Sequence, residues 1–503
     1  PQLDELLAEI PEGVLALLLI PGLGPKKAAV IYKELGIETL PQLRAACEAE
    51  QVRELKGFGA KTEETILAGI DLAERAGERI YWAVADEIVQ RLLDHMSGCK
   101  AVRQIVPAGS YRRGRETVGD LDLLVDATDP NAVMDHFGKF PGIADVIVRG
   151  STKMSVRLDS DIQRDLQVDL RVVPADSFGA ALQYFTGSKE HNVELRSRAK
   201  ERGLKINEWG VFRIGEAGEE ESVGGREESE VYAALDLPCV PPELRENRSE
   251  FFYSGEIELP RLIEEKDLVG DLHMHTTATD GKQTIREMAD AARERGLSYI
   301  AITDHSKRVT MARGLDADRL RAQWKSVDEI NQQFDDFTVL KGIECDILEK
   351  GGMDLPDDVL AEADWVIASV HYGQKQERQQ ITDRILGALE NRWVSIVAHP
   401  TGRILNKRDP YAVDIEAVFQ AARENGKLLE LNANPARLDL DDVHSARAKQ
   451  LGIPIVISSD AHSTSGLDVL RYGILQARRG GLTASDVANT RSWKEVLALV
   501  SRG

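Results

Sequence analysis

The sequence predicts a multidomain α/β protein that ends in a parallel α/β barrel, and three observations lead to this fold class. The chain has 503 residues, which is enough for several domains. Its first part is helical and is interrupted by two similar glycine turns, and its middle part mixes strands with helices. From about residue 268, short apolar strands alternate with amphipathic helices in seven repeats, an order typical of a barrel.

Composition limits the classes of function. Hydrophobic residues make up 42% of the chain, yet no apolar run approaches the roughly 20 residues that a membrane span needs, so we expect no membrane partner. The four cysteines are scattered, which favours a reducing, cytoplasmic setting. The net charge of −21 argues against binding DNA by overall electrostatics but allows local basic groups and backbone amides to do so. Because the chain starts at Pro1 rather than Met, we expect a further N-terminal portion.

Two glycine turns mark the helical region. They read Gly22-Leu23-Gly24 and Gly57-Phe58-Gly59, and the nearby lysines are Lys26, Lys27 and Lys61. Glycines let backbone amides approach a phosphate without reading base sequence. One such turn alone is usually only a connection between helices. Each turn lies between helical stretches, as in a helix-hairpin-helix element.

A pair of aspartates opens a strand in the middle part. Asp120 and Asp122 are two residues apart, so both side chains point to one face, and Asp169 on a neighbouring strand completes a carboxylate group. Such a group suits two Mg²⁺ ions that bridge phosphates. Gly109 and Ser110 would offer a close backbone and a hydroxyl to phosphate, with Arg113 as charge partner. Together with the three aspartates, these residues form the predicted site. The alternative is an exposed strand start with solvated aspartates.

A second block follows at Tyr184-Phe185-Thr186-Gly187-Ser188, with Asn192, Arg196 and Ile206-Asn207-Glu208 beyond it. Together with residues 109–122, it resembles the DNA polymerase beta-like X family over about residues 10–248. The resemblance implies that Tyr184 and Phe185 line the sugar of the incoming nucleotide and that Asn192 reaches its base. It also implies nucleotide contacts from Gly119 and Gly187, and a template contact from Arg196.

This resemblance implies a DNA-directed DNA polymerase that uses dNTPs and Mg²⁺ on gapped or primed duplex DNA. Two glycine turns beside a polymerase-like palm favour a role for those turns in holding DNA. The carbonyls of Leu18, Ile20 and Leu23 would hold a monovalent cation in the first hairpin. We expect a cytoplasmic, nucleoid-associated monomer. A nucleotidyltransferase that does not act on DNA is an alternative.

Histidines and carboxylates gather at the ends of the predicted barrel strands. Six of the seven strand ends offer such ligands. The predicted ligands are His273, His275, Asp280, His305, Glu344, His371, His399, Asp460 and His462. Nine ligands exceed what one ion needs, so we expect two to three ions, and imidazole with carboxylate suits Zn²⁺, Mn²⁺ or Fe²⁺. Satisfied buried histidines are the alternative, which fits one or two of these residues better than all nine.

The ligand pattern resembles the PHP (polymerase and histidinol phosphatase) family over about residues 268–503. The resemblance implies three ligand groups: His273, His275, Glu344 and Asp460; Asp280, His305 and His462; and Glu344, His371 and His399. It implies a metal-dependent phosphoesterase with Mn²⁺ or Zn²⁺. Fused to a polymerase, this region would be a 3′–5′ exonuclease; a small-molecule phosphatase and a structural module that positions DNA are the alternatives.

The expected domains follow from these two resemblances. They are a helix-hairpin-helix region at 1–78, a nucleotidyltransferase palm at 79–175, a thumb-like subdomain at 176–248, a linker at 249–267 and a distorted (βα)7 PHP barrel at 268–503.

Overall fold

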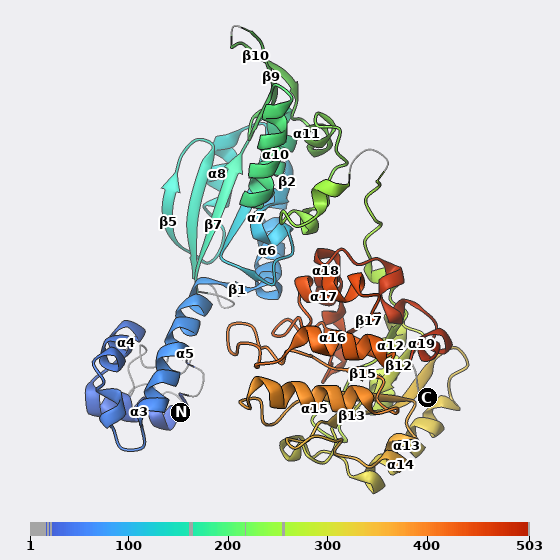
Figure 1. The fold of residues 1–503 in the computed structure, drawn as a ribbon. Helices are drawn as coiled ribbons and strands as arrows, with labels where there is room; N and C mark the ends of the chain where they lie inside the picture. The colour runs from blue at the N-terminus through green and yellow to red at the C-terminus, as the bar shows by residue number, and fades with distance from the viewer. Residues whose placement is uncertain are drawn as a thin grey trace. The chain divides into compact units, whose positions relative to one another are not determined.

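The computed structural model describes residues 17, 20, 23–159, 164–216, 218–253 and 257–500 (Figure 1). The chain divides into two compact units, Pro1–Ile80 with Arg403–Pro410, and Tyr81–Gly402 with Tyr411–Gly503. In the described part of the chain, no helix is long and apolar enough to cross a membrane. The multidomain α/β class predicted from the sequence is confirmed.

The first unit is helical, and its turns are fixed by buried groups. Its elements are α3 (Pro25–Leu35), α4 (Leu40–Glu48), η1 (Val52–Glu54) and α5 (Ala60–Glu78). Helices α3 and α5 each begin directly after the second glycine of a Gly-x-Gly turn. The buried carboxylate of Glu63 accepts hydrogen bonds from the Arg53 backbone N–H (2.8 Å) and from its Nε (2.7 Å). This pair ties η1 to α5 and so holds the second glycine turn, where Gly57 has a φ of 90° that favours glycine.

The second unit begins with a five-stranded mixed sheet in the order β2-β4-β7-β6-β5. Strand β4 pairs parallel with β7, while the other pairs are antiparallel. The elements of this region are β1 (Ile80–Tyr81), α6 (Trp82–Ser97), β2 (Val102–Pro107), α7 (Gly109–Arg112), β3 (Thr117–Val118), β4 (Asp120–Ala127), α8 (Pro130–Phe137), β5 (Ile143–Arg149), β6 (Lys153–Asp159) and β7 (Arg164–Val172). Because β4 and β7 run parallel, their starts lie at the same edge of the sheet.

A smaller helical region with a three-stranded antiparallel sheet, β10-β9-β8, follows. Its elements are η2 (Ala175–Ser177), α9 (Phe178–Thr186), α10 (Lys189–Glu201), β8 (Leu204–Asn207), β9 (Gly210–Ile214), β10 (Glu220–Gly224), α11 (Glu228–Ala233), η3 (Pro242–Leu244) and η4 (Glu250–Phe252). Its core holds a charged network. The guanidinium of Arg245 is fully buried and donates to Glu228, which also accepts both Nη atoms of Arg112 at 2.8 Å. Burial raises the pKa of Glu228, but the two arginines outweigh it and bring that pKa to about 2.

We expect Glu228→Ala to destabilise the protein by roughly 3–5 kcal/mol, because it leaves the buried charge of Arg245 without its partner. The depressed pKa gives the sign of the pH effect: the stabilisation is present above the ordinary carboxyl pKa and is lost as pH falls toward 2. Denaturant unfolding at neutral pH measures the change. Glu221→Ala, which removes an exposed pair with Arg213 at 3.2 Å, serves as control and should cost less than about 1 kcal/mol. Equal losses in both variants would contradict the prediction.

The rest of the unit is a parallel barrel whose strands follow chain order from β11 to β17, as predicted. Figure 1 shows this region in yellow to red, with helices around the strands. The strands are β11 (Gly270–Asp271), β12 (Tyr299–Ile302), β13 (Thr338–Asp346), β14 (Trp365–Ser369), β15 (Ile396–Val397), β16 (Leu428–Asn432) and β17 (Ile455–Ser458). A parallel bridge between Met274 and Ala461 joins the two ends of the sheet. This connection completes the distorted barrel beyond the short strand β11.

Helices cover the outside of the barrel. They are α12 (Ile285–Glu294), α13 (Ala317–Asn331), α14 (Asp357–Leu360), α15 (Arg378–Glu390), α16 (Ile415–Glu424), α17 (Asp442–Gln450), α18 (Leu470–Arg479) and α19 (Trp493–Leu499). Between these helices and the strands lies one buried apolar cluster, and a separate cluster inside the barrel includes Leu340, Leu428 and Val456. Because strand side chains alternate, Glu344 lies on the same face of β13 as Leu340. The interior is therefore apolar at one end and polar at the other, where the predicted ligands lie.

Candidate functional site

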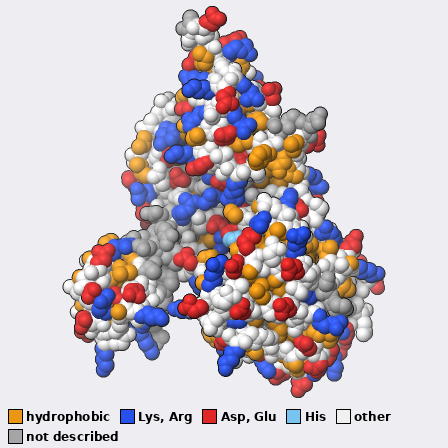
Figure 2. Space-filling view, in the orientation of Figure 1, with side chains coloured by type: hydrophobic (Ala, Val, Ile, Leu, Met, Phe, Trp, Pro, Cys, Tyr) orange, Lys and Arg blue, Asp and Glu red, His pale blue; other side chains and the backbone are white. Residues whose placement is uncertain are grey.

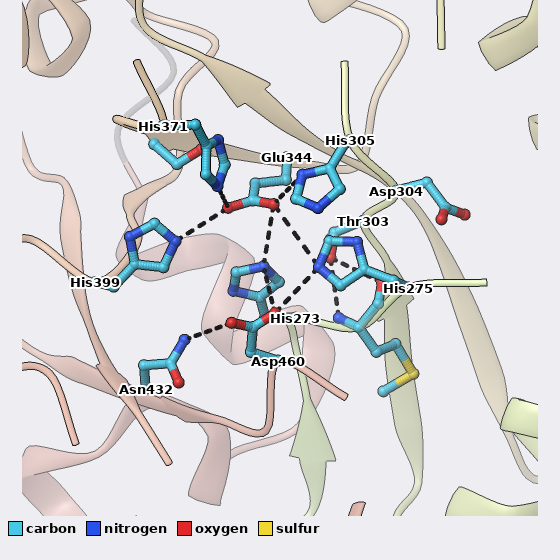
Figure 3. A network of polar contacts seen from close by, with 12 residues as sticks. His273, His275, Thr303, Asp304, His305, Glu344, His371, His399, Asn432 and Asp460 are labelled. Atoms are coloured by element: carbon cyan, nitrogen blue, oxygen red, sulfur yellow. Dashed lines mark hydrogen bonds and ion pairs between the residues drawn. The ribbon is translucent and has the colours of Figure 1, made fainter. Parts of the chain in front are cut away.

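All nine predicted barrel ligands lie at the carboxyl ends of the strands or in the loops that follow. Figure 3 shows histidines from several strands converging on Glu344 of β13. One oxygen of Glu344, Oε1, lies 3.2 Å from Nε2 of His399 and 3.4 Å from Nε2 of His371. The other, Oε2, lies 2.7 Å from Nδ1 of His305 and 3.6 Å from Nε2 of His273. Because Nε2 of His275 also lies 3.7 Å from Oε2, Glu344 is the carboxylate that five histidines share.

The cluster divides into three groups whose ligand atoms lie within 4.8 Å of one another. These are His275, Asp280, His305 and His462; His273, His275 and Asp460; and His305, Glu344 and His371. Two residues, His275 and His305, each belong to two groups, which differs from the division expected from the sequence. His399 is in none of these groups, although it contacts Glu344. Neighbouring groups share ligands because the strand ends are close together.

Several polar atoms in this cluster are buried without a hydrogen-bond partner. They include Nε2 of His273 and Nδ1 of His275. Buried polar atoms are normally hydrogen-bonded, so each needs an explanation. Nε2 of His273 is 3.6 Å from carboxylate oxygens of both Glu344 and Asp460, too far for a hydrogen bond. Imidazole nitrogens and carboxylate oxygens around such gaps form a donor set that fits divalent metal ions.

The electrostatics of the cluster also favour bound cations. Burial lowers the pKa of His273, but Glu430, Asp460 and Glu344 outweigh burial and raise it well above the usual range. In His305 burial also acts to lower the pKa, while Glu344 and Asp280 bring it to about 10. The buried carboxylates are therefore stabilised by positive charge, which either protons or metal ions can supply. Protons and metal ions compete for the same imidazole nitrogens.

Three residues that hold the ligands were missed from the sequence. In β16, Glu430 accepts from Nδ1 of His273 at 2.7 Å, and Asn432 donates to Oδ2 of Asp460 at 3.1 Å. Asp346, two residues after Glu344, accepts from the backbone N–H of His371 at 3.0 Å and from its Nδ1 at 3.1 Å. Strand alternation is the signal that could have found them, because each lies on the inner face of its strand.

The predicted carboxylate group of the mixed sheet lies on two paired parallel strands, at the start of β4 and within β7. Asp122 of β4 is directly opposite Asp169 of β7, and Asp120 is the first residue of β4. Burial, together with Asp120 and Asp169, raises the pKa of Asp122 to about 7. Asp169 instead pairs with Nζ of Lys153 at 3.0 Å and accepts from Gln167 Nε2 at 2.9 Å. Mutual repulsion of this kind fits a site for cations, although these three residues do not form one of the tight groups described above.

Backbone geometry explains Gly109 in the same site. Its φ is 62°, and a Cβ there would lie 2.6 Å from Oδ2 of Asp122. The next residue, Ser110, is half-buried in α7, and Gly119 lies between β3 and β4. The guanidinium of Arg113 is engaged inside the protein, with Nε 3.1 Å from Glu246 and Nη1 on the carbonyl of Thr186. Its predicted role as a phosphate partner stays a prediction.

The predicted nucleotide residues lie at the α9–α10 junction. The rings of Tyr184 and Phe185 meet edge to face at 5.2 Å, and Arg171 lies 4.7 Å from the centre of the Phe185 ring. Gly187, with a φ of 72°, follows α9. Nδ2 of Asn192 donates to the Tyr184 carbonyl at 2.8 Å, so its amide is held beside the aromatic pair. Arg196, on the next turn of α10, is exposed.

The predicted DNA contacts of the first unit are accessible. Gly24, Gly57 and Gly59 are exposed, as are Lys26 and Lys61. Nζ of Lys27 lies 5.6 Å from the ring centre of Phe58, so this lysine is held beside the second turn. Gly22 and Leu18 lie outside the described residues. Figure 2 shows Lys and Arg side chains interspersed with acidic ones on the visible face, which allows local basic contacts despite the net charge of −21.

A helical unit with glycine turns, a mixed sheet with paired aspartates and a barrel whose histidines and carboxylates could hold metal ions are typical of multidomain enzymes of phosphate-ester chemistry. Three family models match: a SAM-like helix-hairpin-helix tandem over residues 14–71, a DNA polymerase beta thumb over 181–246 and a PHP domain over 271–434. A Bacillus subtilis (strain 168) relative named DNA polymerase/3′-5′ exonuclease PolX is 44% identical over 501 residues, 99% of this chain and 86% of that protein. The chain belongs to the PolX family of DNA polymerases.

Other relatives match a smaller part of the chain. A probable phosphatase of Thermoanaerobacter sp. (strain X514) is 30% identical over 234 residues, which are 44% of this chain and 91% of that protein. A probable phosphatase of Caldanaerobacter subterraneus is 31% identical over 206 residues, 39% of this chain and 76% of that protein.

Proposed function

We propose that this protein is a DNA-directed DNA polymerase that fills short gaps during repair and trims 3′ ends with a 3′–5′ exonuclease in its barrel. The observation that carries the proposal is the 44% identity to a polymerase/3′-5′ exonuclease over 99% of this chain. The geometry of two separate carboxylate-containing sites supports it. The proposed substrates are gapped or primed duplex DNA and dNTPs, and the proposed form is a cytoplasmic monomer.

The proposed domains are those expected from the sequence, with a palm at 79–175, a thumb at 176–248 and a PHP barrel at 268–503. In the palm, Asp120, Asp122 and Asp169 would hold Mg²⁺. Ions there would stabilise the charge that develops on the transferred phosphate and activate the primer hydroxyl. The bare backbone of Gly109 leaves room beside Asp122, because any Cβ would contact its carboxylate.

In the barrel, the nine ligands would hold two to three Mn²⁺ or Zn²⁺ ions. Such ions would supply Lewis-acid stabilisation of the phosphodiester under attack. The buried walls of the cluster, where His273 and His275 are fully enclosed, exclude bulk water and keep the imidazoles oriented. Asp280 and His462 are more exposed than these, and substrate would approach the cluster from their side.

The helix-hairpin-helix lysines would bind DNA phosphates. We expect Lys26→Gln and Lys61→Gln each to lower the slope of log affinity against log salt concentration by about 1, because each removes one phosphate contact. Titrating a fluorescent gapped duplex at several salt concentrations measures the slopes. Lys266→Gln, at an exposed lysine of the linker before the barrel, is the matched control. An unchanged slope in both hairpin variants would remove these lysines from the DNA interface.

A phosphatase is the second candidate for the barrel, because several relatives of about its size are named probable phosphatases. A combined assay separates the two readings. A 5′-labelled primer on a gapped duplex is incubated with Mg²⁺ or Mn²⁺, with and without dNTPs, alongside a generic phosphate monoester. The proposal predicts primer extension with dNTPs and a ladder of shortened primers with Mn²⁺ alone. Monoester turnover without primer shortening would make the barrel a phosphatase, and an unextended primer would refute the polymerase.

A further inference from the structure

Strand β16 (Leu428–Asn432) is the one barrel strand to which the sequence assigns no metal ligand. Its inner face nevertheless carries Glu430 and Asn432, two polar side chains that are 1% and 0% exposed. A polar residue is buried at a cost unless it forms hydrogen bonds, so their partners reveal their role. Those partners include ligand residues that follow three other strands, β11, β15 and β17.

Glu430 joins two ligand residues through its two oxygens. Oε1 lies 2.7 Å from Nδ1 of His273, and Oε2 accepts the backbone N–H of His399 at 2.7 Å. An ionised carboxylate can only accept, so Nδ1 of His273 carries a proton, and in the neutral imidazole the lone pair is left on Nε2. That Nε2 is the atom that is buried without a hydrogen-bond partner. Glu430 therefore sets the tautomer in which His273 can bind a metal.

The contact to His399 also has a structural reason. His399 has a φ of 30°, in the region that residues with a side chain rarely adopt. Its amide points at Oε2 of Glu430 in this conformation, while its Nε2 lies 3.2 Å from Glu344. An unusual backbone conformation persists only where its surroundings hold it. The carboxylate of Glu430 is the hydrogen-bond acceptor that stabilises this conformation of His399.

Asn432 extends the same support to a third ligand. Its Nδ2 donates to Oδ2 of Asp460 at 3.1 Å, as Figure 3 shows, and lies 3.3 Å from Oε2 of Glu430. Oδ1 of Asp460 remains directed at the histidines, 3.1 Å from Nε2 of His275. One carboxylate oxygen of Asp460 is thus hydrogen-bonded to Asn432, while the other faces the histidines.

We propose that Glu430 and Asn432 are positioning residues that orient His273, His399 and Asp460 from the strand that provides no ligand. The inference rests on the proposed metal centre. It adds that one pair of side chains on β16 orients ligands that belong to different groups. Because the partners of metal ligands set their orientation and tautomer, their loss typically weakens metal affinity by about 10–100-fold.

The test measures Mn²⁺ binding rather than catalysis. The full chain is stripped with chelator, in a background carrying Asp169→Ala so that the palm does not contribute, and titrated with Mn²⁺ while free Mn²⁺ is followed by electron paramagnetic resonance. We expect Glu430→Gln to weaken binding about 10–100-fold, because an amide cannot accept from both donors. Asn432→Ala should weaken it about 10-fold through Asp460 alone.

The chain offers a matched control in Glu250. This carboxylate is also buried, lies 2.9 Å from Nδ1 of the buried His191 and accepts backbone N–H groups, but it is remote from every predicted ligand in sequence and contacts none of them. Glu250→Gln should leave Mn²⁺ affinity unchanged. A second readout is the rise in melting temperature that Mn²⁺ gives each variant relative to its own metal-free form, which should shrink only in the β16 variants.

Each outcome is decisive. Equal Mn²⁺ affinity in Glu430→Gln, Asn432→Ala and the parent would overturn the positioning role while leaving the metal centre intact. Equal weakening in Glu250→Gln would also overturn it, since the effect would then be general. If Glu430→Gln does not fold, Asn432→Ala decides alone. No Mn²⁺ binding by the parent would refute the metal centre itself and the inference with it.

Discussion

Asp169→Ala abolishes nucleotide incorporation and leaves primer degradation at its original rate. We expect a loss of about 1,000-fold or more, since removing a carboxylate that holds catalytic ions withdraws roughly 4 kcal/mol of transition-state stabilisation. The reason lies in the register: Asp169 stands directly opposite Asp122, so no other carboxylate can take its place between β4 and β7. Single-nucleotide incorporation into a gapped duplex in Mg²⁺ measures the effect.

The control for this variant is Asp126→Asn on the same strand. Asp126 is buried and pairs with Arg103 at 2.7 Å, at the far end of β4 from the site. Its replacement should lower stability but retain incorporation in folded protein. Substantial incorporation by Asp169→Ala, or equal loss in the control, would contradict the assignment of the palm site.

Glu344→Gln removes the exonuclease while polymerisation survives. Both oxygens of Glu344 face histidines, and its pKa lies well below the usual range because His371, His305 and His273 outweigh the effect of burial. An amide keeps the shape but loses the charge that the cluster shares, so we expect Mn²⁺-dependent shortening of the primer to fall by about 1,000-fold or more.

A matched change elsewhere in the barrel is Glu416→Gln. Glu416 is exposed and pairs with Arg447 at 2.9 Å on the outer helices. The Glu416→Gln variant should degrade primer at the parent rate in the same gel. Retention of exonuclease activity by Glu344→Gln would show that the cluster is not the hydrolytic site.

The fold was predictable where the pattern in the sequence is strong. Strands that alternate with helices predict the order of β11 to β17. Side-chain alternation predicts that His273 and His275 point to the same side of the sheet. The spacing of Asp120 and Asp122 likewise predicts that both side chains lie on one face of β4. These inferences succeed because they depend on local geometry that the chain fixes by itself.

What the sequence could not predict depends on contacts between distant segments. The sharing of His275 and His305 between ligand groups depends on how closely the strand ends approach. The engagement of Arg113 by Glu246 depends on packing across 133 residues of chain. Strand alternation places Glu430 on the inner face of β16, but only its distance to His273 shows that it contacts a ligand.

The central claim is that two independent sites in one chain act on DNA, one adding nucleotides and one removing them. The most direct measurement compares Asp169→Ala and Glu344→Gln on one 5′-labelled gapped duplex, with extension and shortening rates taken from the same reactions. The account predicts reciprocal results: the first variant shortens but does not extend, and the second extends but does not shorten. Loss of both activities in either folded variant would contradict it.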